Sequence, residues 1–421
     1  MTDLSTSGAP ARVTWGEVLA IREFRAMVLS DGLSVLGDQV ARIAVALLVY
    51  DRTGSAFAAS ATYACSFLVW LVGGPVLSVY ADRYPRRELM IACDVVRAPL
   101  VALLAVPHLP LAAIFVVLAL VGVLSPPFES ARSALLPDIL AGDRYLVGNA
   151  ITNTVAQTGQ VLGFLLGGVL VATISTSGAL VMDALTFAVS AWVLITMVSS
   201  RPVPVDPQGE SSGVLSDTRE GFSYVTRDPH LRALLCMALL GVACLIVPEG
   251  LAVAVTAELD GGPLAAGVLT AAVPLGFVLG SAAVLRVQVE RRLRLLPLLL
   301  VIGSAPLIAT PFIHGLSMTT LLWIAAGLGS ALQLIANAAF VQAVPSHLRG
   351  RAFGLAGTSI MAAQGLALLV AGLAAEHVGA RRAVGSAGAA ALLLVVFVSR
   401  MSYRVQAPAQ GVPDFARRPQ G

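Results

Sequence analysis

The segment Ser78–Leu89 reads SVYADRYPRREL and carries five charges in a chain that otherwise avoids them. The apolar runs on either side are each about 20 residues long, which is the length of an α-helix that crosses a bilayer. A charged turn between two such runs is typical of a membrane protein whose helices are joined by short polar connections. The segment therefore predicts a helical membrane fold, and the rest of the chain divides in the same way.

The composition of the whole chain agrees with this interpretation. Of the 421 residues, 57% are hydrophobic and 12% are charged, whereas soluble domains carry about 25% charged residues. Such a chain has too little polar surface to face water, and recurring long apolar runs favour spanning helices. The net charge of +3 gives no sign of the strongly basic balance that nucleic-acid binding needs. We expect an all-α integral membrane protein that binds no nucleic acid.

Several enzyme classes are excluded by what the sequence lacks. The 27 strongly basic residues are all arginine, so the lysine of a phosphate-binding P-loop is missing. Any pumping must therefore draw on an ion gradient or on a partner protein. The stretch Gly209–Gly213 matches the pattern of a nucleophile elbow, but it lies in a proline-rich segment with no preceding strand. The histidines and cysteines lack metal-ligand spacing, and we expect no enzyme, no metal and no cofactor.

Twelve apolar stretches are long enough to span a membrane. The first six are residues 25–50, 55–80, 88–106, 109–127, 146–173 and 177–199. The second six are residues 231–257, 263–286, 295–313, 316–342, 350–375 and 381–400. We predict two pseudo-symmetric six-helix bundles, with these divisions of the chain: an N-terminal segment 1–24, a bundle 25–199, a linker 200–230, a bundle 231–400 and a tail 401–421.

The arginines predict the orientation of these spans. If the N-terminus is cytoplasmic, 22 of the 27 arginines fall in inner segments and only three in outer ones. Cytoplasmic connections carry such an excess of positive charge. We therefore expect a multi-pass protein of the plasma (inner) membrane with both termini in the cytoplasm. The pair Arg381–Arg382 lies on the outer side and is the exception, so the topology of the last hairpin stays open.

The first span contains three charges, Asp31, Asp38 and Arg42, within about 60° of one helical face. An unpaired charge near the middle of a bilayer costs about 2.5–3.5 kcal/mol on insertion scales. The face must therefore point into the bundle or into a wet cavity. Asp38 and Arg42 stand at i and i+4 and can form a structural ion pair. Alternatively, Asp38 is a proton or cation site, with Asp31 as a further candidate.

Other charges also fall within spans. Asp94 and Arg97 stand at i and i+3, where a local salt bridge or a substrate contact is possible. Asp183 and Glu249 are further intramembrane carboxylates, and Pro248 predicts a kink beside Glu249. Glu249 is either a proton or cation site of the second half or a residue near the outer surface.

The fifth span reads GQVLGFLLGGVL and places small residues on one face. The residues concerned are Gly159, Gly163, Gly167 and Gly168. Such a stripe lets a neighbouring backbone approach closely. We expect tight packing there and, beyond it, a face that slides or rocks.

Together these segments resemble the major facilitator superfamily of secondary transporters, in particular its twelve-helix drug:proton antiporters of the macrolide-efflux and siderophore-exporter branch. The opening segment is similar to the family signature G-x-x-x-D-R-x-G-R-[RK], with Ser78 and Pro85 at the two glycine positions. The matching residues are Asp82, Arg83, Arg86 and Arg87. Further similar pieces are LGDQ, CDVVRA, ARSALLPDIL, MDALTFAVSA and VPSHLRGRAFG, in the family order. The fifth-span glycines resemble the antiporter motif, with Phe164 where proline is usual.

The resemblance implies alternating access by two rocking bundles, with the charged 2–3 loop acting at a gate. It favours proton-coupled efflux of a bulky amphipathic small molecule such as an antibiotic or a siderophore. Proton-coupled uptake of a nutrient is the alternative, and a membrane sensor or enzyme is a remote one. The expected partners are the lipid bilayer, the cargo and protons, and we expect a monomer. The candidate polar groups of the cargo cavity are Gln157, Gln160, Gln333, Asn337 and Gln364.

Overall fold

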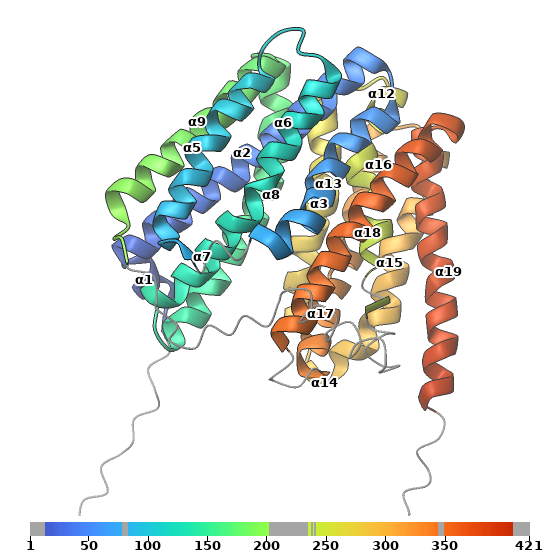
Figure 1. The fold of residues 1–421 in the computed structure, drawn as a ribbon. Coiled ribbons are helices and arrows are strands. Elements are labelled where there is room, and N and C mark those ends of the chain that lie inside the picture. The colour runs from blue at the N-terminus through green and yellow to red at the C-terminus, as the bar shows by residue number, and fades with distance from the viewer. Residues whose placement is uncertain are drawn as a thin grey trace, which may run out of the picture.

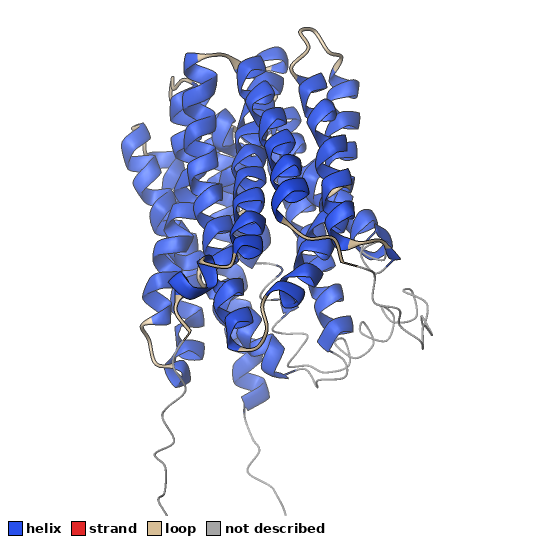
Figure 2. Ribbon diagram, turned by 90° about the vertical axis from the view of Figure 1, so that its left-hand side faces the viewer, coloured by secondary structure: helices blue, strands red, loops and turns tan. Residues whose placement is uncertain are grey.

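A computed structural model of the chain describes residues 13–77, 83–201, 235–236, 239, 241–343 and 349–406. Every regular element in these ranges is helical, and the long helices run side by side, as Figures 1 and 2 show. Eight of them are long and apolar enough to cross a membrane. The expected all-α membrane fold is therefore confirmed.

The first half of the chain forms six crossings after a short helix, α1 (Trp15–Leu19). They are α2 (Arg22–Thr53), α3 (Ala56–Leu77), α5 (Arg86–Leu104), the pair α6 (Leu111–Val123) and α7 (Ser125–Ile139), α8 (Asp143–Thr173) and α9 (Thr176–Met197). Helix α2 packs against both α8 and α9, and α5 packs against α9. These contacts make the half a bundle around α2.

The fourth crossing is longer than the sequence suggested. The predicted end at residue 127 is wrong, because α6 and α7 together cross from Leu111 to Ile139. Pro126 and Pro127 look like helix breakers, but they occupy the first turn of α7, where proline fits without loss of a hydrogen bond. The stretch Ala131–Pro137 therefore lies within α7.

The second half forms six more crossings. They are residues 241–245 with α12 (Val247–Glu258), α13 (Pro263–Leu285), α15 (Leu296–Ala309), the pair α16 (Leu316–Ser330) and α17 (Leu332–Ala343), α18 (Arg349–Val378) and α19 (Ala380–Gln406). A short helix, α14 (Val289–Arg292), precedes α15. The twelve-helix prediction holds for the described part of the chain. The linker predicted at 200–230 lies almost entirely outside the described residues, as does the tail after Gln406.

The last hairpin is compact. Helix α18 ends at Val378 and α19 begins at Ala380, because Gly379 between them has φ +90°, a left-handed conformation that glycine adopts readily. The guanidinium of Arg381 donates to the carbonyl oxygens of Pro311 (2.9 Å) and Ile313 at the end of the ninth crossing. Arg381 therefore has specific acceptors that account for its place outside the arginine pattern.

The most extensive contacts between the two halves are made by two pairs of helices, and α12 packs against α3 beside them. Helix α3 packs against α18, and α8 packs against α13, as the blue–orange and green–yellow neighbours in Figure 1 indicate. The hydroxyl of Ser60 in α3 donates to the carbonyl oxygen of Leu368 in α18 at 2.6 Å. The beginning of the described chain at α1 and the end of α19 lie at the same end of the molecule in Figure 1, as an even number of crossings requires.

Candidate functional site

An open cavity lies between the two halves of the molecule, with about 610 Å³ of empty space when the solvent at its mouth is included. Helix α8 lines it from the first half, and helices of the seventh, eighth, tenth and eleventh crossings line it from the second. Its polar side chains are Gln157, Gln160, Glu249, Ser330, Gln333 and Gln364. The structure therefore brings four of the five proposed cavity residues to one place. Asn337 is exposed and does not line this cavity.

Glu249 lies in the first turn of α12 and faces this cavity. The chain is interrupted at Ile246, and Pro248 takes one of the first positions of α12, so the expected kink is present beside Glu249. The Glu249 side chain is 5% exposed, and its Oε1 has no hydrogen-bond partner in the described part of the chain. A carboxylate at this position faces the positive end of the helix dipole. Of the two sequence-based interpretations, this burial favours the proton or cation site over a residue near the outer surface.

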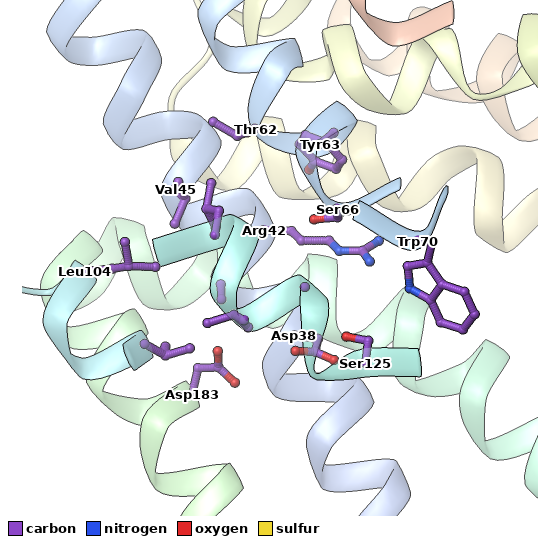
Figure 3. Close-up of a pocket in the computed structure, with 15 residues that line it drawn as sticks. Asp38, Arg42, Val45, Thr62, Tyr63, Ser66, Trp70, Leu104, Ser125 and Asp183 are labelled. Atoms are coloured by element: carbon purple, nitrogen blue, oxygen red, sulfur yellow. The ribbon is translucent and has the colours of Figure 1, made fainter. Parts of the chain in front are cut away.

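A second pocket of about 660 Å³ lies within the first half (Figure 3). It holds three charged residues, Asp38, Arg42 and Asp183, together with Thr62, Tyr63, Ser66, Trp70 and apolar side chains. The ion pair that the spacing of Asp38 and Arg42 allows is not among those formed by the described residues. Instead, the Arg42 guanidinium lies 5.6 Å from the ring centroid of Phe67, a cation–π distance.

Asp183 of α9 reaches the backbone of α2 beside Asp38. A Cβ atom at Gly37 would collide with Asp183 Oδ1 and Thr186 Oγ1, so only glycine leaves room for this approach. Asp183 is 1% exposed and its Oδ2 is without a hydrogen-bond partner among the described residues. The pocket therefore brings together two carboxylates that are 145 positions apart in the sequence.

Asp94 and Arg97 belong to a separate buried cluster. Arg97 Nη1 lies 3.8 Å from Asp94 Oδ1, and the Ser190 hydroxyl donates to Asp94 Oδ2 at 2.5 Å. The Arg97 guanidinium lies 5.2 Å from the ring centroid of Phe128 and 5.6 Å from that of Phe187. Neither charged residue lines either cavity. This geometry favours the local salt bridge over the substrate contact.

Asp31 has a strong partner that the sequence analysis missed. Arg132 Nη1 donates to Asp31 Oδ2 at 2.8 Å, and Arg132 Nη2 donates to Glu129 at 2.5 Å. The predicted fourth span ends at residue 127 and so leaves Arg132 outside the membrane, whereas the helix continues to Ile139. The i,i+3 spacing of Glu129 and Arg132 was a usable sign of helix there. Within the described residues, no group of three or more His, Cys, Asp or Glu side chains could hold a metal ion.

The described part of the connection between α3 and α5 contacts the ends of neighbouring helices. Arg86 pairs with Asp138 of α7 and donates to the Ala134 carbonyl oxygen at 2.8 Å. Arg87 donates to the carbonyl oxygens of Leu194 (3.1 Å) and Ile195 (2.6 Å) in the last turn of α9. These acceptors explain two cations at the unfavourable end of the α5 dipole. Arg83 is exposed, and Asp82 lies outside the described residues.

The glycine stripe of α8 faces two different helices. A Cβ at Gly163 would lie 2.7 Å from the Leu36 carbonyl oxygen of α2, and Gly159 and Gly167 also face α2. A Cβ at Gly168 would instead lie 2.8 Å from Gly267 Cα of α13. Three of the glycines thus pack inside the first half, and only Gly168 lies where the two halves meet. A sliding face along the whole stripe does not agree with this packing.

Comparisons with known proteins agree with this arrangement. The chain is 26% identical over 357 residues to the multidrug efflux pump Tap of Mycolicibacterium fortuitum, covering 82% of this chain and 87% of that protein. It is 26% identical to the enterobactin exporter EntS of Escherichia coli over 67% of each chain. A crystal structure of the nucleoside transporter NupG superposes with a TM-score of 0.72 at 13% identity, covering 90% of this chain and 98% of that one.

The family model described as Major Facilitator Superfamily matches residues 27–313, more than half of the chain. This match accounts for the helical fold, the two halves and the cavity between them. It also excludes an enzyme as the best description of the protein. The chain is a multi-pass membrane transporter of the Major Facilitator Superfamily.

Proposed function

We propose that this transporter exports bulky amphipathic small molecules across the plasma membrane, with both of its termini in the cytoplasm. The observation that carries the proposal is the open cavity to which both halves contribute. Its lining is divided evenly between apolar side chains and side chains with hydrogen-bonding or charged groups, and an amphipathic molecule can use both kinds of surface. The relatives named as a multidrug efflux pump and an enterobactin exporter support export as the direction.

The contacts between the halves support alternating access. Near the end where α2 passes into α3, Gly168 meets Gly267 and Glu376 of α18 accepts hydrogen bonds from the Ser55 hydroxyl (2.6 Å) and the Phe57 amide (2.9 Å). With the termini inside, this is the outer end, so these contacts close the cavity from outside. Separation of the same helix pairs would open it.

The proposed energy source is inward proton flow, with Asp38 as the first coupling site. The pocket of the first half holds two carboxylates, Asp38 and Asp183, and one guanidinium, Arg42. One carboxylate therefore has no matching positive charge, and a proton can supply it. Asp31 is already paired with Arg132, which leaves Asp38 and, in the other half, Glu249 as the better candidates.

Inside-out membrane vesicles test this proposal. Acidifying their lumen should drive accumulation of a fluorescent dye such as ethidium, and a proton ionophore should abolish it. Asp38→Asn should reduce gradient-driven accumulation at least tenfold while leaving dye exchange intact. Asp51→Asn, at the exposed outer end of the same helix, is the matched control and should behave as the wild type. Dye leaving vesicles with an acidic lumen would instead favour proton-coupled uptake by the cell.

A further inference from the structure

The charge of the cavity between the halves comes from one side chain of the described residues. Among the described residues that line it, Glu249 is the only ionisable one, and the other polar groups are glutamines and Ser330. Glutamine side chains offer both donors and acceptors and are indifferent to the sign of a ligand's charge. The sign of the cavity is therefore set by one carboxylate.

Glu249 has no ion-pair partner among the described residues. Helix α12 is packed between α3 and α18 at this point, where Gly250 faces both Ser60 and Leu368. From α3, the buried side chain of Tyr63 packs near the same point. The cation whose field acts on Glu249 is Arg42 of α2, but Arg42 lines the other pocket together with Asp38 and Asp183.

An unpaired carboxylate that is 95% buried in a cavity between two membrane-spanning bundles favours any ligand that brings a positive charge. Removing a lone charge from water is costly, and a close counter-charge offsets that cost. An anionic ligand in the same place would add a second negative charge near Glu249. Phe277 and Pro274 give the neighbouring wall an apolar surface, on which the body of an amphiphile can pack.

We propose that the cargo is an amphipathic organic cation, an amine or an onium ion, and that Glu249 is the residue that selects its charge. The proposal rests on the proposed function, because it assumes that the central cavity holds the cargo. The two relatives are named for different cargoes, several drugs in one case and enterobactin in the other. Their names therefore do not indicate the charge of the molecule that this chain carries, whereas the carboxylate in the cavity does. Anionic amphiphiles, including deprotonated catechols, are poor ligands in this view.

A matched pair of probes tests the charge selection. Tetraphenylphosphonium and tetraphenylborate have nearly the same size and shape and opposite charges. Binding of each is measured to the full-length protein in lipid nanodiscs, after subtraction of binding to protein-free nanodiscs. We expect specific binding of the cation, at least tenfold weaker binding of the cation to Glu249→Gln, and recovery in Glu249→Asp. The anion should bind the wild type weakly and should not lose affinity in Glu249→Gln.

Asp260→Asn is the control, because it removes an exposed carboxylate of the same half at a position with φ +54°, where asparagine is tolerated. It should bind the cation as the wild type does. Equal binding of the cation by wild type and Glu249→Gln, absence of specific cation binding, or tighter binding of the anion would each overturn the proposal. In that case, vesicle transport of an anionic or neutral dye would still support export. Conversely, cation binding without gradient-driven transport would refute the proposed function, and Glu249 would then select the charge of a bound ligand but not of a transported cargo.

Discussion

At the scale of single residues, the buried carboxylates divide by whether another helix supplies a partner. Asp31 and Asp94 are matched by Arg132 and by Arg97 with Ser190. Glu249 faces a cavity without an ion-pair partner in the described contacts. Buried ionisable groups inside membranes mark functional sites chiefly when they are unpaired or line a cavity. The first group is therefore expected to affect stability, and the second to affect transport.

The pair Asp31–Arg132 gives the first test of this division. Arg132→Gln leaves the 2%-exposed Asp31 without its partner, and breaking a buried pair in this way costs about 3–5 kcal/mol. The purified variant should unfold at a lower temperature in detergent than the wild type. The double variant with Asp31→Asn should recover most of the loss, because no lone charge remains. A double variant that is no more stable than Arg132→Gln would show that the pair is not what holds α2 to α7.

Gly37 offers a test of the buried carboxylates that are expected to affect transport. Gly37→Ala places a methyl group where Asp183 and Thr186 now lie, so Asp183 must move away from Asp38. We expect proton-driven transport in vesicles to fall several-fold while dye exchange continues. Gly122→Ala is the control, because its Cβ would lie at an ordinary 3.5 Å from Val69 in the same pocket. Unchanged proton-driven transport by Gly37→Ala would remove Asp183 from the coupling site.

At the scale of helices, hydropathy alone predicts the number and order of the crossings, and the errors have local causes. The predicted fourth span ends at residue 127, at the pair Pro126 and Pro127, whereas proline fits the first turn of a helix without loss of a hydrogen bond. The error displaced Arg132 from the membrane and hid its pairing with Asp31. A single sequence does not predict which helix a residue faces, because the partner residue comes from a distant segment of the chain. The four cavity glutamines could be predicted because each is a polar side chain in an apolar helix. Such a side chain must face water or another polar group.

The glycine stripe of α8 yields a prediction at the same scale. Gly168→Leu should keep α8 and α13 apart at the outer end, because the new side chain meets the Gly267 backbone. Spin labels at residues 51 and 260 on a cysteine-free background should report a longer mean distance between the halves. Gly163→Leu, which faces α2, should instead lower the unfolding temperature without lengthening that distance. Equal lengthening by both variants would mean that the stripe acts as one face after all.

At the scale of the whole molecule, the two halves share a helix cap at the end where α2 passes into α3. Glu376 of α18 accepts from the Phe57 amide in the first turn of α3, an orphan donor that the helix itself cannot satisfy. The second half thereby caps a helix of the first, and opening at this end must break the cap. A capping interaction contributes about 0.5–2 kcal/mol, enough to shift an equilibrium between two conformations severalfold without preventing either.

Glu376→Ala should therefore favour the state in which the outer end is open. Hydrogen–deuterium exchange should increase at residues 56–58, because the Phe57 amide loses the carboxylate and the Ser55 hydroxyl that accepts from the Ala58 amide loses its own acceptor. It should remain unchanged at the start of α19, where Glu258 caps from within its own half. Transport should slow, because the outer end must close once in each cycle. Glu376→Gln retains an acceptor oxygen and should restore most of the protection. If exchange at residues 56–58 were the same in Glu376→Ala and the wild type, the cap would contribute nothing to closure, and the α3–α18 and Gly168–Gly267 contacts alone would have to close the outer end.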